Sequence, residues 1–413
     1  MDGERLQDKD VVCLGHLQRA FELLEPLHDV GCARDRAGNR ELHFDDYVKL
    51  VLLYTWNPLI QSVHDLQQVV GLPRVAKALG VKRFSAGSFS ESVRIFDPER
   101  LKPVIQELAS QLQPYAKDPR LSNFKHIITL VDGTVLAGLV RLVKAAVGPE
   151  GRYTTRRDGL GMYGWRLHTQ LELDTLTPNR LGLTGARNAG DNREANVLLA
   201  NLEAGRCYVN DGGYANRKLF DAIVAAGSSF VTRAPENSVF ELVEERELSQ
   251  EALNAEITRD AIVRLEGSDR LWRRIEVQVE PHPRRTRHGT QQSDLIVLYS
   301  DMLDLAPELV GLIYSKRYTV ELFFRMLKQL LGLRHLLSQR EEGIEIQVYC
   351  AVIVCLLIQL ISGKKPNKAM RNIVSWYLLG LADAQDVLNF LNKPDNTGVK
   401  KRAQEERWKK LGY

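Results

Sequence analysis

Residues 314–328 read Tyr-Ser-Lys-Arg-Tyr-Thr-Val-Glu-Leu-Phe-Phe-Arg-Met-Leu-Lys. On a helix, at about 100° per residue, this stretch divides into an apolar side and a polar side. The polar side carries Tyr314, Arg317, Glu321, Arg325 and Lys328. The spacing therefore predicts a helix that packs one side on a core and presents a single carboxylate flanked by cations and a phenol. A metal ligand among phosphate-binding groups fits this pattern, and an ordinary solvated helix face fits it about equally well.

Two aspartates further upstream follow apolar, β-branched runs. Residues 127–135 are Ile-Ile-Thr-Leu-Val-Asp-Gly-Thr-Val, and residues 207–214 are Cys-Tyr-Val-Asn-Asp-Gly-Gly-Tyr. Each run predicts a strand with its carboxylate, Asp132 or Asp211, at or near the end and a glycine behind it. Taken alone, an Asp-Gly pair after a strand is most often a turn. Combined with Glu321, the two aspartates form a set of hard oxygen ligands suited to two divalent ions in phosphodiester chemistry.

Six polar residues together resemble the signature of bacterial cut-and-paste DDE transposases of the insertion-sequence-four family: the run Tyr314-x2-Arg317-x3-Glu321-x6-Lys328, preceded by Asp132 and Asp211. The resemblance covers roughly residues 40–360. It implies an α/β fold with a ribonuclease H-like catalytic core, in which the three carboxylates bind two Mg²⁺ ions, with Mn²⁺ as a substitute. It also implies that Tyr314, Arg317 and Lys328 hold phosphates of the transposon end. Arg325 lies on the same predicted face but outside the signature.

The same resemblance implies the reaction and its partners. The implied reaction is metal-dependent strand cleavage and strand transfer at the ends of an insertion sequence. The implied partners are double-stranded DNA carrying terminal inverted repeats, a target DNA, and a second copy of the chain, which makes a homodimer in the DNA complex. Two alternatives stay open. A catalytically inactive or domesticated transposase would bind DNA without cutting it, although the intact carboxylates argue against decay. A general nuclease of the same fold would not need the long helical N-terminal region.

Composition agrees with a soluble globular protein of two or three domains. The chain has 413 residues, of which 44% are hydrophobic and 26% charged, and a formal net charge of only +4, so DNA attraction must come from local clusters. Five cysteines without a Cys-x2-Cys pair favour reduced thiols in a cytoplasmic, nucleoid-associated protein and give no case for zinc. The start has no apolar signal core. The most apolar stretch, Val348–Ile358, is too short to span a bilayer and predicts a buried helix.

Residues 1–125 carry helical periodicity and predict an all-helical N-terminal DNA-binding region. Within it, Ser62–Val70 and Arg74–Leu79 predict two short helices across a tight turn, followed by the basic pair Lys82-Arg83. A helix-turn-helix is one interpretation, and a plain helical bundle is commoner for the pattern alone. The family context favours binding of the terminal repeats.

Residues 126–237 and 303–340 predict the catalytic core, with three strands followed by helix, strand, helix and strand. Because 110 residues separate Asp211 from Glu321, the core requires an insertion, and residues 238–302 predict a small β subdomain. Residues 341–413 predict a helical C-terminal region with a basic tail, for which a solvated end is the simpler interpretation.

Several basic segments and one tryptophan are further candidates. The tip of the insertion carries Arg284, Arg285 and Arg287, and DNA contact and a solvated hairpin are equally good interpretations. Basic residues between the first two core strands favour DNA contact slightly: Arg141, Lys144, Arg152, Arg156, Arg157 and Arg166. Relatives with this signature often stack a tryptophan of the insertion on a flipped base. Here Trp272 lies on an early strand of the insertion, where a core aromatic is the more common role.

Overall fold

The computed structural model describes residues 19–36, 38–57, 59–114, 118–135, 166–184, 191–235, 238–279, 294–330, 337–338, 340–363, 368–378 and 380–391. The chain divides into two compact units. The helical unit combines the first and last parts of the chain, Met1–Leu108 and Arg340–Tyr413, and the sheet unit is Ala109–Gln339. The N-terminal and C-terminal regions that the sequence predicts separately therefore belong to one unit. The physical reason is that helices from both regions share one apolar core.

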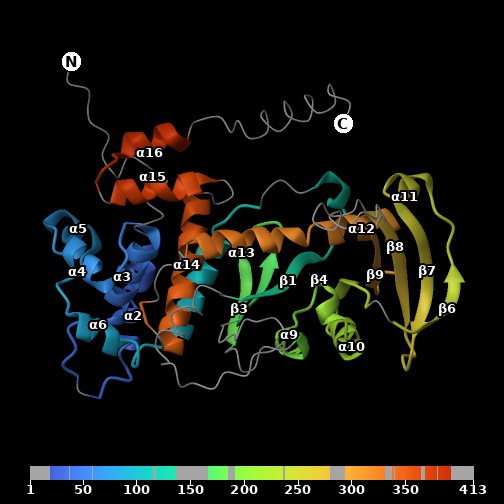
Figure 1. The fold of residues 1–413 in the computed structure, drawn as a ribbon, viewed down its shortest axis with the longest axis horizontal. Helices are drawn as coiled ribbons and strands as arrows, with labels where there is room; N and C mark the ends of the chain where they lie inside the picture. The colour runs from blue at the N-terminus through green and yellow to red at the C-terminus, as the bar shows by residue number, and fades with distance from the viewer. Residues whose placement is uncertain are drawn as a thin grey trace, which may run out of the picture. The chain divides into compact units, whose positions relative to one another are not determined.

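The helical unit contains nothing but helices and turns among its described residues. Its elements are α2 Leu27–Val30, α3 Phe44–Trp56, α4 Val63–Val70, α5 Pro73–Leu79, α6 Ala86–Ser92, the 3₁₀ helix η2 Pro98–Leu101, α7 Lys102–Ser110, α14 Glu341–Ser362, α15 Lys368–Leu378 and α16 Ala384–Leu391. Two of them form its centre: α14 packs against α3 and η2, and α15 also contacts both α3 and α14. Figure 1 shows α14 beside α3, although more than 280 residues separate them in the sequence.

Helix α14 is longer than its apolar stretch suggests. It spans 22 residues rather than the stretch Val348–Ile358 alone, so the prediction that this segment is too short for a membrane was wrong. By length and composition it is the one described helix able to cross a bilayer, but 89% of its most apolar window is buried inside the protein. The buried part of the helix is also longer than the apolar stretch, because the polar residues Gln347 and Gln359, at 2% and 1% exposure, are buried just outside it. The predicted role as a buried helix is confirmed.

Helices α4 and α5 form the predicted pair across a tight turn. The hydroxyl of Ser62 caps α4 by accepting a hydrogen bond from the backbone N–H of Asp65. Pro73 opens α5, where its missing N–H costs nothing, and Gly80 ends it in the left-handed region at φ 67°.

The sheet unit is built around nine strands. They are β1 Ile127–Val135, β2 Arg166–Glu172, β3 Pro178–Thr184, β4 Arg206–Asn210, β5 Ser229–Arg233, β6 Phe240–Glu245, β7 Ile257–Leu265, β8 Leu271–Val279 and β9 Asp294–Ser300. The helices of this unit are η3 Pro119–Leu121, α9 Asp191–Leu199, η6 Gly212–Tyr214, α10 Arg217–Ala225, α11 Gln250–Asn254, α12 Pro307–Ser315 and α13 Tyr318–Leu330.

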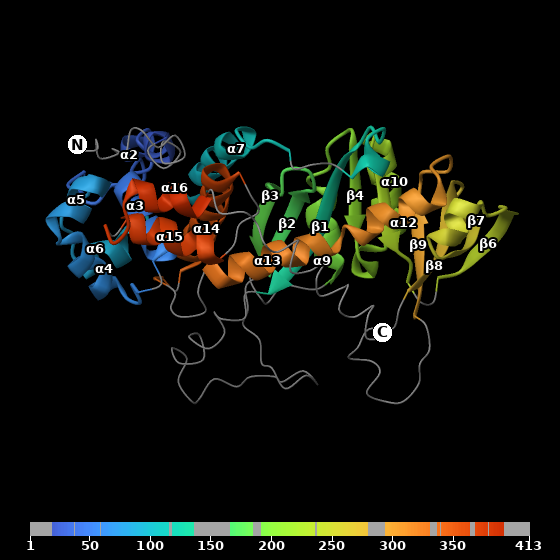
Figure 2. The same ribbon diagram turned by 90° about the horizontal axis from the view of Figure 1, so that it is seen from above.

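The strand order is β3-β2-β1-β4-β5-β9-β8-β7-β6, and Figure 2 shows the labelled strands in this sequence across the sheet. Strands β1, β2 and β3 are antiparallel neighbours, whereas β4 and β5 lie parallel to β1. Three antiparallel strands followed by two parallel strands, each reached through a helix, make a ribonuclease H-like core. The predicted fold class is confirmed: mixed α/β, with helical regions before and after this core.

The insertion is not a separate layer. Its strands β6 to β9 form an antiparallel sheet, and β9 pairs with β5 through Val231↔Ser300 and Arg233↔Leu298. The insertion therefore continues the core sheet beyond β5. Pairing with β9 covers an edge of β5 that would otherwise expose unpaired N–H and C=O groups.

Two groups of helices pack on the sheet. Helices α9 and α10 cover a buried cluster that includes Val131, Tyr208, Phe230 and Trp272. Helices α12 and α13 contact the strands as well, with α13 against β1 and α12 against β4, β5, β7 and β8. Because side chains alternate along a strand, Asp132 points away from the side taken by Val131.

Candidate active site

Asp132 lies inside β1, and the strand continues for three residues beyond it. Its Oδ1 accepts a hydrogen bond of 2.7 Å from the backbone N–H of Gly133. Burial, with a smaller contribution from the charges of Asp211 and Glu321, raises the pKa of Asp132 to about 6, against the opposing effects of the Gly133 hydrogen bond and of Arg317. The charges of the other two predicted carboxylates therefore both reach Asp132.

Asp211 follows β4 directly, as predicted. Its side chain caps the short helix η6 by accepting a hydrogen bond of 2.9 Å from the backbone N–H of Gly213. The hydroxyl of Thr232 on β5 donates to the backbone carbonyl of Asp211 at 3.1 Å. These two bonds fix the chain at the point where β4 ends.

Glu321 lies in the first turn of α13, but the predicted single helix over 314–328 is interrupted. Helix α12 ends at Ser315 and α13 begins at Tyr318. Across the junction the backbone bonds shorten to i→i−3, with Lys316 N–H donating to Ile313 and Arg317 N–H to Tyr314. The Lys316 ammonium also binds Asp118 at 3.0 Å. The tightened turn, held by this ion pair, was not visible in the periodicity.

Arg317, in this junction, connects two of the carboxylates. Its Nη2 donates to Oε1 of Glu321 at 2.7 Å, and its Nη1 lies 3.8 Å from Oδ2 of Asp132. The guanidinium is about four-fifths buried, so its attraction to both carboxylates is screened only weakly. It places a positive charge between the helix and the strand.

Tyr314 and Lys328 belong to the same cluster. Burial raises the pKa of Tyr314, with Arg317 and Arg233 opposing and Asp211 adding to the rise. Burial lowers the pKa of Lys328, and the charge of Asp132 opposes that shift. Each side chain is therefore within electrostatic reach of one aspartate, and its role in binding phosphate stays a prediction.

Arg325 does not join this cluster through any described contact to a carboxylate. It is exposed and its Nη2 donates to the phenol oxygen of Tyr318 at 2.9 Å. Arg284, Arg285 and Arg287 lie outside the described residues, as do the basic residues from Arg141 to Arg157 and the C-terminal tail.

Sequence reasoning missed Arg233, the last residue of β5. The parallel register of β4 and β5 ends at Asn210↔Thr232, so Asp211 and Arg233 are each the next residue along the chain after this last pair. The effect of Arg233 on Tyr314 places its charge beside the cluster. The sequence does show an apolar run that ends in Arg233, but only the register of β4 and β5 shows that this run ends near Asp211.

Trp272 is a core residue. Its ring is 1% exposed, its Nε1 donates to Ser268 Oγ at 3.2 Å, and it packs near Phe220 and Phe230. The core interpretation is confirmed, and a ring so enclosed has no free face on which a base could stack.

The residues fit a divalent metal. Asp132, Asp211 and Glu321 offer hard oxygen ligands, and the charges of Asp211 and Glu321 both act on Asp132, whose pKa is raised mainly by burial. A second group of potential ligands, His28, Asp45 and Asp46, has its ligand atoms within 4.8 Å of one another in the helical unit. There the ammonium of Lys49 already lies 3.1 and 3.4 Å from the two carboxylates, which makes a buried polar network.

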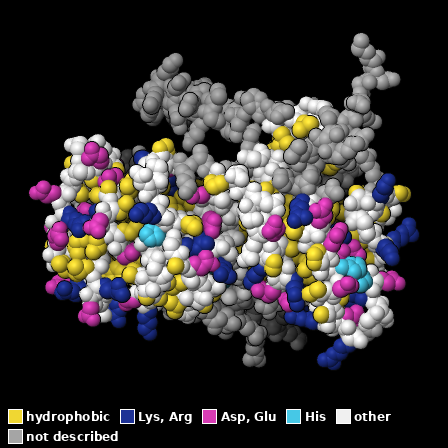
Figure 3. Space-filling view, turned by 180° about the vertical axis from the view of Figure 1, so that it is seen from behind, with side chains coloured by type: hydrophobic (Ala, Val, Ile, Leu, Met, Phe, Trp, Pro, Cys, Tyr) yellow, Lys and Arg dark blue, Asp and Glu magenta, His cyan; other side chains and the backbone are white. Residues whose placement is uncertain are grey.

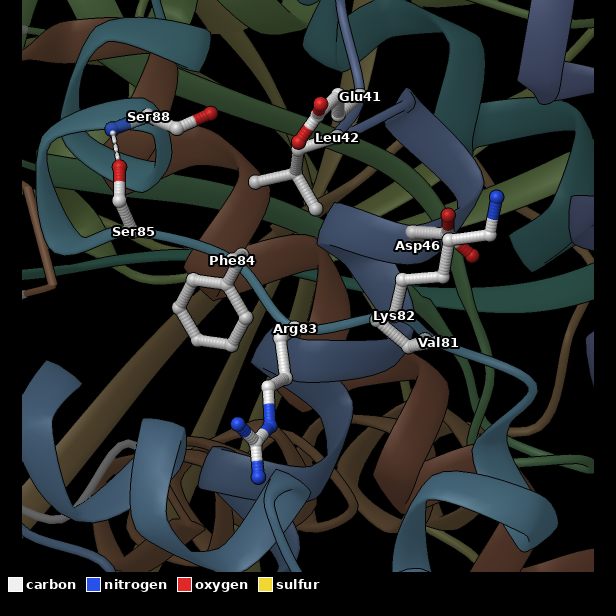
Figure 4. A pocket seen from close by; sticks show the side chains of 9 residues that line it. All are labelled: Glu41, Leu42, Asp46, Val81, Lys82, Arg83, Phe84, Ser85 and Ser88. Carbon is white, nitrogen blue, oxygen red and sulfur yellow. Dashed lines mark hydrogen bonds between the residues drawn. The ribbon is translucent and has the colours of Figure 1, made fainter.

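The helical unit also holds a pocket with an empty volume of about 380 Å³. It is lined by Glu41, Leu42, Asp46, Val81, Lys82, Arg83, Phe84, Ser85 and Ser88. Figure 4 shows that Arg83 points away from the two acidic residues. Surface charge is mixed elsewhere: on the face seen in Figure 3, Lys and Arg side chains are interspersed with Asp and Glu.

Comparison with known proteins identifies the domain. The family model described as "Transposase DDE domain" matches residues 123–357, more than half of the chain. A curated relative from Sinorhizobium fredii (strain NBRC 101917 / NGR234), named "Putative transposase y4zB", is 26% identical over 227 residues, which are 54% of this chain and 60% of that protein. A solved structure titled "Cryo-EM structure of piggyBac transposase synaptic complex with hairpin DNA" covers 95% of this chain and 84% of its own, at 12% identity and a TM-score of 0.45. By the family match, the chain belongs to the transposase DDE domain family.

Proposed function

We propose that the chain is a DNA transposase of the insertion-sequence-four family that cleaves and transfers DNA strands at the ends of an insertion sequence in a cut-and-paste reaction. The observation that carries the proposal is the position of Arg317. Its guanidinium lies between Glu321 on α13 and Asp132 on β1, while Asp211 ends the neighbouring strand. This arrangement supports the signature roles that the sequence suggests.

Asp132, Asp211 and Glu321 would hold two Mg²⁺ ions, or Mn²⁺ in their place. When bound, such ions supply Lewis-acid activation of the attacking oxygen and stabilise the leaving oxygen of a phosphodiester. The chain's own part is to keep the carboxylates ionised and oriented. The backbone bonds to Asp132 and Asp211 serve this purpose, because each fixes one carboxylate oxygen.

The cations around the carboxylates would bind the DNA backbone. Arg317, Lys328 and Arg233, with the phenol of Tyr314, surround the carboxylates with donors suited to phosphate oxygens. Arg317 would exchange its bond to Glu321 for a phosphate when that carboxylate takes up a metal. A phosphodiester held in this way lies next to the carboxylates, which is what cleavage requires.

The helical unit would recognise the terminal inverted repeats. Helices α4 and α5 form two short helices across a turn, and the exposed Lys82 and Arg83 follow them at the rim of the pocket in Figure 4. Exposed cations next to such a pair suit contacts to the phosphates of a duplex. A second copy of the chain on the other transposon end, and a target duplex, complete the proposed assembly.

The test is cleavage of a duplex carrying the element's end in Mg²⁺. Asp132→Asn, Asp211→Asn and Glu321→Gln keep the shape of each side chain but remove its charge. Each should lose cleavage by at least about 10³-fold while still binding the duplex. Asp221→Asn on α10, an exposed carboxylate paired with Arg270, is the matched control and should cut normally.

Wild-type cleavage by any of the three variants would remove that residue from the proposed site. If the unmodified protein binds the ends but never cuts them in Mg²⁺ or Mn²⁺, the chain is the inactive, DNA-binding alternative.

A further inference from the structure

Thr169 lies directly opposite Asp132. The two residues pair across the antiparallel strands β2 and β1. Side chains of such a pair point to the same face of the sheet, with Cβ atoms about 5 Å apart. Thirty-seven positions separate them in the sequence, so only the strand register reveals that a hydroxyl accompanies the aspartate.

The hydroxyl of Thr169 is buried and has no hydrogen-bond partner. The residue is 2% exposed, and its Oγ1 belongs to the buried polar atoms without a partner. The other buried threonines among the described residues each have one: Thr55, Thr129, Thr177 and Thr232. A buried hydroxyl without a partner destabilises the fold, and it therefore calls for an explanation.

The carboxylate of Asp132 has room for one more donor. Its Oδ1 accepts from Gly133, whereas among the described residues its Oδ2 meets just the guanidinium of Arg317, at 3.8 Å, beyond hydrogen-bond length. The residues that hold a metal ion are usually oriented by further hydrogen bonds, and a hydroxyl on the adjacent strand is placed to supply one.

We propose that Thr169 is a positioning residue for Asp132: its hydroxyl donates to the Asp132 carboxylate and orients it when the site holds a divalent ion. This inference rests on the proposed function, because it takes Asp132 as a metal ligand. In the metal-free protein the hydroxyl is left without its partner. The unpartnered hydroxyl of Thr169 thus destabilises the metal-free protein, and in the metal-bound protein it orients the Asp132 carboxylate.

The test compares Thr169→Val with Thr169→Ser in the full-length protein. Valine keeps the branched shape and removes the hydroxyl, whereas serine keeps the hydroxyl. Mn²⁺ binding, followed by electron paramagnetic resonance without DNA, should be weaker by about 10- to 100-fold in the valine variant and restored by serine. In cleavage assays the Mg²⁺ concentration for half-maximal rate should rise in the valine variant, while the rate at saturating Mg²⁺ changes much less.

Thermal unfolding separates this role from a structural one. Without metal, Thr169→Val should melt at the same temperature as the wild type or higher, because it removes a buried group that has no partner. Thr55→Val is the matched control: its hydroxyl donates to Val51 O at 2.8 Å in the helical unit, so its loss should lower the melting temperature and leave Mn²⁺ affinity unchanged.

Asp132→Asn separates failure of this inference from failure of the proposed site. If Asp132→Asn loses Mn²⁺ affinity and Thr169→Val keeps it, the positioning role is overturned and the metal site stands. If Thr169→Val loses affinity and melting temperature together and serine restores neither, Thr169 is structural and the inference is wrong. If Asp132→Asn binds Mn²⁺ as tightly as the wild type, the metal site itself is wrong and the inference falls with it.

Discussion

His168 on β2 is a histidine enclosed by the sheet. It is 5% exposed, and its Nε2 lies 2.8 Å from the hydroxyl of Thr184 on β3. Burial, together with the charge of the neighbouring Arg166, lowers its pKa from 6.5 to about 4. The imidazole is therefore neutral at physiological pH, which suits a structural role and leaves it a poor general acid.

This histidine should make stability depend on pH. Between pH 6.5 and 4 the unfolded chain binds a proton on His168 that the folded protein does not, so unfolding becomes easier as pH falls. Between pH 6.5 and 4 the free energy of unfolding should fall by about 2 kcal/mol, after allowance for partial screening of the charge by solvent. Urea titrations from pH 8 to pH 4 should show this loss in the wild type and not in His168→Gln. His64→Gln, an exposed histidine on α4, shows what a solvated imidazole contributes, and an equal slope in His168→Gln would disprove the assignment.

Arg317 and Lys328 should reveal phosphate contacts through salt. If each binds one phosphate, Arg317→Ala and Lys328→Ala should each lower the slope of log affinity against log salt by about one. Arg264→Ala on β7 is the control, since that exposed arginine pairs with Glu241 at 2.8 Å. An unchanged slope combined with a lower melting temperature would make Arg317 and Lys328 structural supports for the carboxylates.

At the scale of elements, the strands of the insertion hold the segment that leads to α12 and α13. Arg273 on β8 and Asp260 on β7 form an ion pair of 2.7 Å, and their side chains are only 2% and 3% exposed. Arg273 also donates to the backbone carbonyls of Met302 and Leu305, just before α12. The insertion therefore fixes the start of the α12–α13 segment that carries Glu321.

Removing one member of this pair should be costly. Arg273→Met leaves Asp260 as a buried charge without a partner and frees two carbonyls, so the free energy of unfolding should fall by about 3–5 kcal/mol. The double variant Asp260→Leu/Arg273→Met should recover part of this loss in urea unfolding, because both charges are gone. If the single variant costs less than about 1 kcal/mol, solvent reaches the pair and the segment is held by other contacts.

Local sequence patterns predicted most elements but not how they join. Alternation of β-branched residues located β1, β4 and the strands of the insertion, because a half-buried strand has period two. It did not reveal the pairing of β9 with β5, which depends on which sheet edge is left open. Nor did it show the break at Lys316–Arg317, which is stabilised by a distant residue, Asp118.

At the scale of the whole molecule, local patterns in the sequence likewise predicted part of the candidate site, and long-range pairing decided the rest. The signature residues were recognisable because they either lie close together in the chain or follow an apolar run. Arg233 and Thr169 were not recognisable, because the sequence does not show that their strands, β5 and β2, pair with the strands that lead to Asp211 and carry Asp132. Long-range register decides such neighbours, and a single sequence carries little information about it.

The helical unit should depend on both ends of the chain. Truncation after Gln339 removes α14, whose residues from Tyr349 to Ile358 are at most 1% exposed, and uncovers the buried side of α3. The truncated protein should lose the thermal transition of the helical unit and aggregate, whereas the sheet unit keeps its own. Co-expression of residues 340–413 as a separate chain should restore solubility. A soluble truncated protein with both transitions would show that α3 finds other cover.

The discontinuous helical unit also sets an order on biosynthesis. Residues 19–108 leave the ribosome before α14, the helix that completes their core, because the whole sheet unit is translated between them. The sheet unit, being continuous, has all of its strands available before α14 is translated, and domains tend to fold as units as soon as they are complete. A nascent chain that stalls just before α14 therefore carries Asp132, Asp211 and Glu321 on a finished sheet unit but lacks a finished helical unit.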